Sequence, residues 1–261
     1  GDSWFKYPTI FDQGAPINLI RALDSAHQPH GARYFLNEHG VAGATSDELT
    51  SGDYRDDLTR SLQHGYDFLL LSMAGNDFVG TNDVDGQLVT TFGQFIVDFD
   101  GQTTGQDVLD QHAVSLRLDE TIANYQRIFR LCEGHSANKN IQIVTHTYDF
   151  VMPTDRGASV LNRFHVRGPW MYGDLVKKHI PRNLWNDVAK AFLSQFAARL
   201  KALADDLNSH TTTGVRLLVA DTQGTLPAGD SSYWINEIHP KNIGYDLLVA
   251  KLQEIIDPIR D

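Results

Sequence analysis

The chain has 261 residues, of which 41% are hydrophobic and 21% are charged, and this ordinary composition excludes a disordered or fibrous protein. The 33 acidic residues outnumber the 22 basic residues and give a formal net charge of -11, which disfavours nucleic acid and anionic lipid surfaces as partners. A chain of this length can fold around a single core, so we predict one domain over residues 1–261. No apolar run approaches the roughly 20 residues that span a bilayer, so we predict no membrane span.

Predicted strands and helices alternate along the chain. Apolar runs rich in branched and aromatic residues predict a weak strand at 32–36 and buried strands at 66–73, 141–144 and 215–220. Helical patterns lie at about 46–63, 114–132, 186–207 and 245–259. Such alternation is typical of a parallel sheet that helices cover on both faces. The sequence therefore predicts an α/β domain of three layers.

Two segments interrupt this alternation. Residues 79–106 are rich in Gly, Asp and Thr, and residues 153–182 contain the run GPWMYG. Long loops of this kind are uncommon in a compact domain unless they shape a site. We expect both segments to form walls of a substrate cleft.

The only cysteine, Cys132, lies on the apolar side of a predicted helix, which indicates a buried structural thiol. One cysteine cannot form an intrachain disulfide. This favours a reducing compartment such as the cytoplasm, and it is also compatible with export.

Polar residues gather at the ends of the predicted strands. In an open parallel sheet, ligands bind at the carboxyl ends of the strands. Four stretches qualify, namely GDSW at 1–4, GVAGAT at 40–45, AGND at 74–77 and NEIHP at 236–240.

These stretches hold the groups that acyl transfer requires. The hydroxyl of Ser3 needs a base to become a nucleophile, and the imidazole of His239 is a candidate. The backbone N–H groups of Ser3 and Gly43 and the side-chain amide of Asn76 are candidate donors to an oxyanion. Each residue alone has an ordinary explanation, because Gly-Asp-Ser and Gly-Asn-Asp are common turns and His239 before Pro240 fits a helix entry.

The four stretches together resemble the SGNH hydrolases, also called the GDSL esterase/lipase family, and bacterial members in particular. That family has a GDS turn, a glycine turn, a G-x-N-D turn and a D-x-x-H-P stretch, and counterparts run here from Ser3 to Pro240. The resemblance implies a flavodoxin-like α/β/α fold. It also implies that Ser3 is the nucleophile, that Ser3, Gly43 and Asn76 form the oxyanion hole, and that His239 is the base.

The chain departs from the family pattern in three places. Asn236 stands where the family has the aspartate that orients the imidazole. A Ser-His dyad supported by Asn236 is one reading, and a carboxylate from Asp221 or Asp230 is another; the resemblance implies that Glu237 points elsewhere. Ala74 replaces the usual glycine of the third block. The family also has a strand before the GDS turn, and we expect such a strand to precede Gly1.

Aromatic residues offer a substrate pocket. Tyr148 follows a predicted strand, and with Trp170 and Tyr172 it could line the acyl or alcohol pocket or simply form a hydrogen-bonded strand end. Trp4 and Phe5 fit packing beneath the site slightly better than an apolar wall.

We therefore predict a carboxylic ester hydrolase that forms a serine acyl-enzyme, acts on a small-molecule or acylated ester and uses no cofactor and no metal. A carbohydrate O-acetyl esterase or an acyltransferase would use the same groups. Asn236 also motivates a third possibility, an inactive binding module on the same fold.

Overall fold

The computed structural model describes residues 1–6, 18–26, 34–84, 87–135, 137, 139–160 and 164–260. At its centre lies a parallel sheet in the order β1-β4-β7. The strands are β1 (Phe68–Leu71), β4 (Gln142–His146) and β7 (Arg216–Ala220). All three lie within or beside the predicted apolar runs, and such runs arise because both faces of a parallel sheet are covered.

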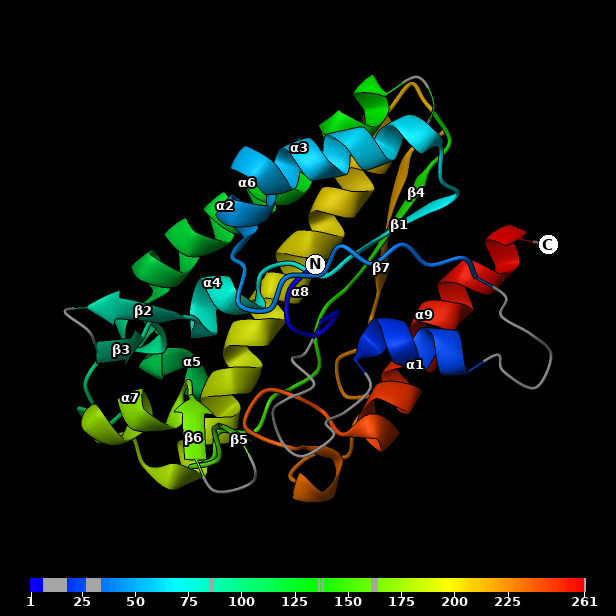
Figure 1. The fold of residues 1–261 in the computed structure, drawn as a ribbon. Coiled ribbons are helices and arrows are strands. Elements are labelled where there is room, and N and C mark those ends of the chain that lie inside the picture. Colours follow the sequence, from blue (N-terminus) through cyan, green and yellow to red (C-terminus); the bar gives the residue numbers. More distant parts are fainter. Residues whose placement is uncertain are drawn as a thin grey trace.

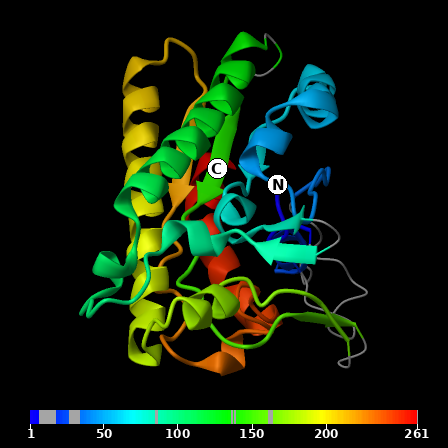
Figure 2. The ribbon, with the colours of Figure 1, turned by 90° about the vertical axis from the view of Figure 1, so that its left-hand side faces the viewer.

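Helices cover both faces of this sheet (Figures 1 and 2). The long helices α6 (Gln111–Gly134) and α8 (Trp185–His210) lie on one face, and α9 (Asn242–Arg260) lies on the other with α1 (Leu19–Ser25) packed against it. Rings such as Tyr125, Phe129 and Phe196 fill the core between α6, α8 and the sheet. The predicted three-layer α/β/α fold is confirmed.

Cys132 is fully buried in α6, and burial raises its pKa to about 12. The thiol therefore stays protonated and inert, which confirms its predicted structural role. In the part of the chain that the structure describes, none of the helices has both the length and the apolar character needed to cross a membrane.

The weak strand predicted at 32–36 is wrong for residues 34–36, which form no strand; residues 32 and 33 lie outside the described residues. The Tyr34 hydroxyl donates to the Asp257 carboxylate of α9 at 2.6 Å, and Phe35 is 96% exposed. The side chains of 34–36 alternate between half-buried and exposed, as in an extended segment, but the segment is hydrogen-bonded into no ladder. An apolar run in the sequence does not show whether a neighbouring strand is available to pair with it.

The helix predicted at 46–63 is divided in two. The pieces are α2 (Ser46–Leu49) and α3 (Gly52–Ser61), followed by the 3-10 turn η2 (Leu62–His64). Gly52 has φ +50°, a left-handed conformation that interrupts a regular helix and favours glycine. Thr45 and Glu48 form a capping box at the start of α2, with the Thr45 N–H donating to the Glu48 carboxylate at 2.8 Å.

The two segments predicted as long loops contain regular structure. The first begins with the end of α4 (Gly75–Val79) and holds an antiparallel hairpin of β2 (Thr81–Val84) and β3 (Gln87–Thr90), then η3 (Phe92–Phe95) and α5 (Gly105–Val108). The second holds a hairpin of β5 (Ala158–Val160) and β6 (Phe164–Arg167), then α7 (Tyr172–Lys177), and ends at η5 (Arg182–Leu184). Figure 1 shows both hairpins and α7 grouped at one end of the molecule. The strands of both hairpins have only three or four residues, too few for a recognisable alternating pattern.

Candidate active site

Ser3 and His239, 236 residues apart in sequence, meet beside the sheet. Ser3 lies in a tight turn that follows Asp2, whose N–H donates to the Ser72 carbonyl at 2.9 Å just after β1. His239 lies in the loop before α9, which includes the short 3-10 turn η6 (Ser231–Tyr233), and this loop is closed by the Ile235 N–H donating to the His239 carbonyl at 2.9 Å. The Ser3 Oγ and the His239 Nε2 are 2.9 Å apart. A hydroxyl and an imidazole at this distance can exchange a proton directly.

Trp4, the residue after Ser3, joins the Ser3 turn to the His239 loop. The Trp4 indole Nε1 donates to the Ile238 carbonyl at 3.1 Å, so the neighbours of Ser3 and His239 are themselves hydrogen-bonded. Trp4 and Phe5 are 3% and 4% exposed, and Trp4 stacks on His146 with ring centroids 5.3 Å apart. Both rings lie packed in the core below the site, although Trp4 also borders the cavity described below.

Asn236 determines which nitrogen of His239 carries the proton. The Asn236 Oδ1 accepts from the backbone N–H of Ile238 at 3.2 Å and of His239 at 2.9 Å, and it lies 3.0 Å from the His239 Nδ1. An amide oxygen only accepts, so the Nδ1 is the protonated nitrogen and the Nε2 faces Ser3 as an acceptor. The arrangement has the tautomer that a general base needs.

The carboxylates that could have replaced Asn236 lie elsewhere. Asp221 accepts from the Lys201 Nζ at 2.6 Å on the surface, and Asp230 is exposed and accepts from the Ser232 N–H at 2.8 Å. Glu237 turns away from the imidazole toward the backbone of 170–172. Among the described residues, the group seen at the Nδ1 of His239 is therefore an amide oxygen.

Burial sets the charge of His239. The side chain is 2% exposed, and desolvation lowers its pKa to about 3. A negative charge next to the Nδ1 would act in the opposite direction, and the Asn236 amide brings none. The imidazole is consequently neutral over the physiological range, and a neutral imidazole is able to accept a proton.

Asn76 lies beside Ser3 on the rim of a small cavity that both residues line. Its Nδ2 donates to the Ala44 carbonyl at 3.0 Å, which uses one of the two amide hydrogens. Ala74, two residues earlier, has φ 128° and is 1% exposed. Such a φ is strained for a residue with a Cβ, and the buried surroundings hold it in place.

Gly43 lies in the loop next to these residues. It has φ +87°, and the Asn76 side chain holds its neighbour Ala44. The Val41 N–H donates to the Gly1 carbonyl at 2.7 Å, which ties this loop to the Ser3 turn. Gly43 does not line the cavity that Ser3 and Asn76 share.

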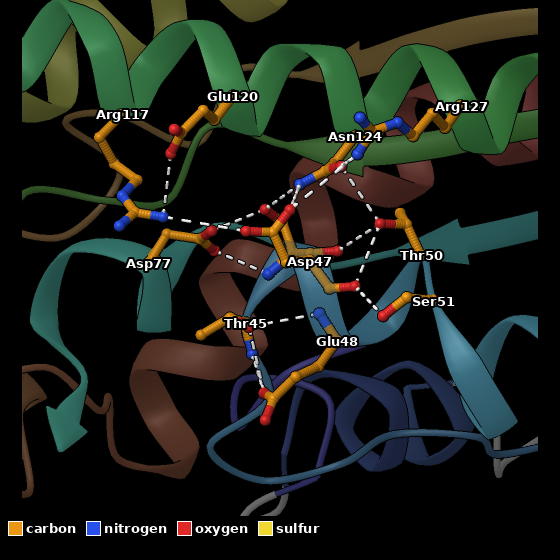
Figure 3. Close-up of polar contacts among 11 residues, drawn as sticks. Thr45, Asp47, Glu48, Thr50, Ser51, Asp77, Arg117, Glu120, Asn124 and Arg127 are labelled. Carbon is orange, nitrogen blue, oxygen red and sulfur yellow. Dashed lines mark hydrogen bonds and ion pairs between the residues drawn. The ribbon is translucent and has the colours of Figure 1, made fainter.

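A polar cluster joins the start of α2 to α4 and α6 (Figure 3). The Asp77 carboxylate accepts from the Ser46 N–H at 2.9 Å and the Ser46 Oγ at 2.6 Å. The Asn124 Nδ2 of α6 donates in turn to the Ser46 Oγ and to the Asp47 Oδ1, each at 2.8 Å. Burial raises the pKa of Asp77 to about 6, against the effect of the Ser46 hydrogen bonds. The residue after Asn76 is thus anchored to the loop that carries Gly43.

A second buried network lies beneath Ser3. The Asp2 carboxylate accepts from the Ser72 Oγ at 2.7 Å, from the Trp4 N–H at 3.1 Å and from the Tyr148 hydroxyl. The Ser72 Oγ also contacts the His146 Nε2 at 2.9 Å, and the Tyr148 hydroxyl accepts from the Gly75 N–H at 3.1 Å. The network therefore links the Ser3 turn, the Asn76 turn and the end of β4. Tyr148 is 4% exposed, so it borders the cavity while its hydroxyl points into this network.

No family model and no curated relative matches the chain. Among solved structures, the chain is similar to a GDSL-like lipase from Parabacteroides merdae, with a TM-score of 0.53 and 12% identity over 97% of this chain and 91% of that chain. The chain has the SGNH hydrolase fold.

Two further solved structures are similar at lower TM-scores. One is a carbohydrate esterase family 3 protein from Talaromyces cellulolyticus, with a TM-score of 0.49 and 13% identity over 100% of this chain and 96% of that chain. The other is an acetyl esterase mutant with an acetate ion, with a TM-score of 0.47 and 12% identity over 90% of this chain and 78% of that chain.

On this SGNH hydrolase fold, the second inserted segment reaches His239 through Trp170. The Trp170 ring is 6% exposed and meets the His239 ring edge to face, with centroids 5.5 Å apart. Tyr172 packs instead against Trp185, with centroids 5.3 Å apart, and it does not line the cavity beside Ser3. The structure thus brings Trp170 to the site and leaves the Tyr172 ring outside it.

Glu237 fastens this segment of the SGNH fold. Its carboxylate accepts from three consecutive backbone N–H groups, those of Trp170, Met171 at 2.8 Å and Tyr172 at 2.8 Å. It is 0% exposed, and burial raises its pKa to about 8, although the backbone donors favour the charged form. The sequence indicated only that Glu237 points away from the imidazole, and it did not predict these backbone contacts. Its position two residues before His239 was the one sign that it lies near the site.

We expect Glu237→Gln to lower the free energy of unfolding by about 1–3 kcal/mol, because an amide NH₂ would face backbone donors that now share one carboxylate. Urea denaturation at neutral pH measures this loss. Glu254→Gln on the exposed face of α9 is the matched control, and its unfolding should be unchanged. An equal loss of unfolding free energy in both variants would contradict the idea that Glu237 holds the backbone of 170–172 in place.

The raised pKa of Glu237 also predicts a pH dependence. The folded state holds this proton up to about 8, whereas an unfolded glutamate releases it near about 4.3. Glu237 therefore stabilises the fold fully below the unfolded pKa, and this contribution is lost as the pH rises through the folded pKa. Between the unfolded and the folded pKa, the free energy of unfolding of the wild type should fall more steeply with pH than that of Glu237→Gln. Parallel pH profiles would show that Glu237 is not the responsible group.

Proposed function

We propose that this protein hydrolyses carboxylic esters through an acyl-enzyme formed on Ser3. The observation that carries the proposal is the 2.9 Å contact between the Ser3 Oγ and the Nε2 of a neutral, buried His239. Asn76, an uncharged amide donor, borders the same cavity as Ser3. The SGNH hydrolase fold, which the chain shares with a GDSL-like lipase, supports this reading.

In the first half-reaction, the Ser3 Oγ attacks the ester carbonyl carbon while the His239 Nε2 takes the hydroxyl proton. The carbonyl electrons move to the oxygen, which the backbone N–H of Ser3, the N–H of Gly43 and the amide of Asn76 would stabilise. When the carbonyl reforms, the C–O bond to the alcohol breaks and the alcohol leaves with the proton from His239. The product at this stage is an ester of Ser3.

In the second half-reaction, water attacks the acyl-Ser3 carbonyl and gives its proton to His239. The bond to the Ser3 Oγ then breaks, the carboxylic acid leaves, and His239 returns the proton to Ser3. Asn236 keeps the imidazole in the required tautomer throughout, through the 3.0 Å contact with the Nδ1. Besides the ester and water, these steps use side-chain and backbone groups of this chain.

Labelling with a fluorophosphonate probe tests the nucleophile. We expect about one label per chain, located on Ser3, because the probe forms its bond only with an activated serine. Peptide mass spectrometry locates the label, and His239→Ala should lose it while the fold is retained. Hydrolysis of p-nitrophenyl acetate is measured on the same samples.

The outcomes of this experiment separate three functions. A labelled Ser3 with acid as product supports the hydrolase. A labelled Ser3 that instead transfers the acyl group to an added alcohol or sugar supports an acyltransferase. A folded protein whose Ser3 stays unlabelled contradicts the proposal and supports a binding module, which the Asn236 amide in place of a carboxylate would then explain.

A further inference from the structure

A small apolar cavity opens directly beside Ser3 and Asn76. We call it the Ser3 cavity; its volume is about 50 Å³. Its walls include the rings of Phe78, Phe92, Phe192 and Phe196 and the methyl group of Ala189. These residues come from α4, η3 and α8, so three separate elements enclose the space.

The size of the Ser3 cavity limits what it can hold. A single water needs at least roughly 10–15 Å³ measured in this way, and pockets for drug-sized ligands measure roughly 300–1,000 Å³. A volume of about 50 Å³ therefore accommodates a few heavy atoms. Acetyl and propionyl groups fit this space, and an acyl chain of about eight carbons does not.

The walls of the Ser3 cavity are held by ring contacts. Phe192 meets Phe78 edge to face with centroids 4.3 Å apart, and it meets Phe92 with centroids 6.4 Å apart. Phe196 lies against Tyr148 at 5.9 Å, and Tyr148 is fixed in turn by the Asp2 network. All four phenylalanine rings are at most 4% exposed. Widening the cavity would require moving rings that are already packed on several sides.

We propose that the Ser3 cavity is the acyl pocket and that the natural substrates are esters of short carboxylic acids, above all acetyl esters. This inference rests on the proposed function, because it places the acyl carbon chain in the space next to the Ser3 Oγ and the Asn76 amide. Phe192 and Ala189 are then the specificity-determining residues of the pocket. The alcohol half of the ester stays outside it.

Rates on p-nitrophenyl acetate, butyrate and octanoate test the proposal. For the wild type we expect kcat/KM for acetate to exceed that for octanoate by about 100-fold, because each methylene that a pocket rejects changes the rate by roughly 10-fold or more. Octanoate hydrolysed within about 10-fold of acetate would overturn the acyl pocket while leaving the hydrolase intact. Absence of turnover for all three esters, with Ser3 unlabelled, would overturn the proposed function and this inference together.

Variants of opposite effect identify the walls. Phe192→Ala should raise the octanoate-to-acetate ratio by about 10-fold or more, and Phe192→Leu is a milder variant that removes less packing. Ala189→Val should narrow the pocket and lower the butyrate-to-acetate ratio by about 10-fold. Each ratio is internal to one sample, so a partial loss of folded protein does not change it.

Matched controls come from residues that do not line the cavity. Ala197→Val makes the same change at another buried alanine of α8, and Phe129→Ala removes a fully buried ring of α6. Both should leave the ester ratios as in the wild type. Unchanged ratios in the Phe192 and Ala189 variants, or equal changes in the controls, would overturn the assignment of the pocket.

Discussion

Ser3→Ala and His239→Ala should each lower kcat for p-nitrophenyl acetate by about 10,000-fold or more, and the double variant should be no worse than either single one. The two side chains are 2.9 Å apart, and in the proposed mechanism they act in one proton transfer, so losing either removes the whole step. The residual rate would come from the oxyanion donors and from substrate binding alone. Steady-state kinetics of the three variants measures this non-additivity.

Stability measurements accompany these rates. Ser3 is partly exposed, so Ser3→Ala should unfold at a temperature close to that of the wild type. Ser209→Ala and His210→Ala make the same changes at exposed positions near the end of α8, and both should keep full activity. A folded Ser3→Ala protein that retains more than a trace of turnover would refute the nucleophile assignment.

Asn236→Asp should raise kcat at neutral pH by about 10-fold or more, since the reverse change in a serine protease triad costs about 10,000-fold. A carboxylate at this position can keep the three contacts of the Asn236 Oδ1, to the Ile238 N–H, the His239 N–H and the His239 Nδ1. It adds a negative charge next to the imidazolium that forms when Ser3 loses its proton. Asn236→Ala removes the acceptor and should lower kcat instead.

The pH profile of the same variant gives an independent test. Burial lowers the pKa of His239 to about 3, so the base is deprotonated above that pH and wild-type kcat/KM should persist well into the acid range. A neighbouring carboxylate favours the imidazolium and raises the pKa, which moves the acid limb of Asn236→Asp to higher pH. An acid limb at the same pH in both proteins would show that residue 236 does not set the charge of the base.

The sequence was sufficient for the elements whose residues carry their own pattern. The apolar runs that became β1, β4 and β7 belong to a sheet covered by helices on both faces, and such strands are recognisable without knowledge of their partners. The segment at 34–36 has the same composition but no ladder, and only the tertiary structure distinguishes the two cases. The hairpins in the inserted segments were hidden for another reason, because each of their strands has only three or four residues.

The site divides in the same manner. Ser3, Asn76 and His239 stand in short stretches that could be recognised one by one, and the structure brings these three together. The residues that hold the site in place could not be found in this way, because their hydrogen bonds join distant parts of the sequence. Asp77 accepts from Ser46, 31 residues away, and Glu237 accepts from Met171, 66 residues away. Nothing in the residue type says whether a glutamate points at an imidazole two residues on or at a distant backbone. The direction of the Glu237 side chain depends on the tertiary structure, which places the backbone N–H groups of 170–172 within its reach.

The hydrogen bond from the Trp4 indole to the Ile238 carbonyl has a consequence for the life of the polypeptide. The segments around Ser3 and His239 lie 236 residues apart in sequence, and both must be in place before the hydroxyl meets the imidazole. During synthesis, the segment between them emerges while this pair is still incomplete. The proposed pair therefore forms only when these two distant segments have folded together.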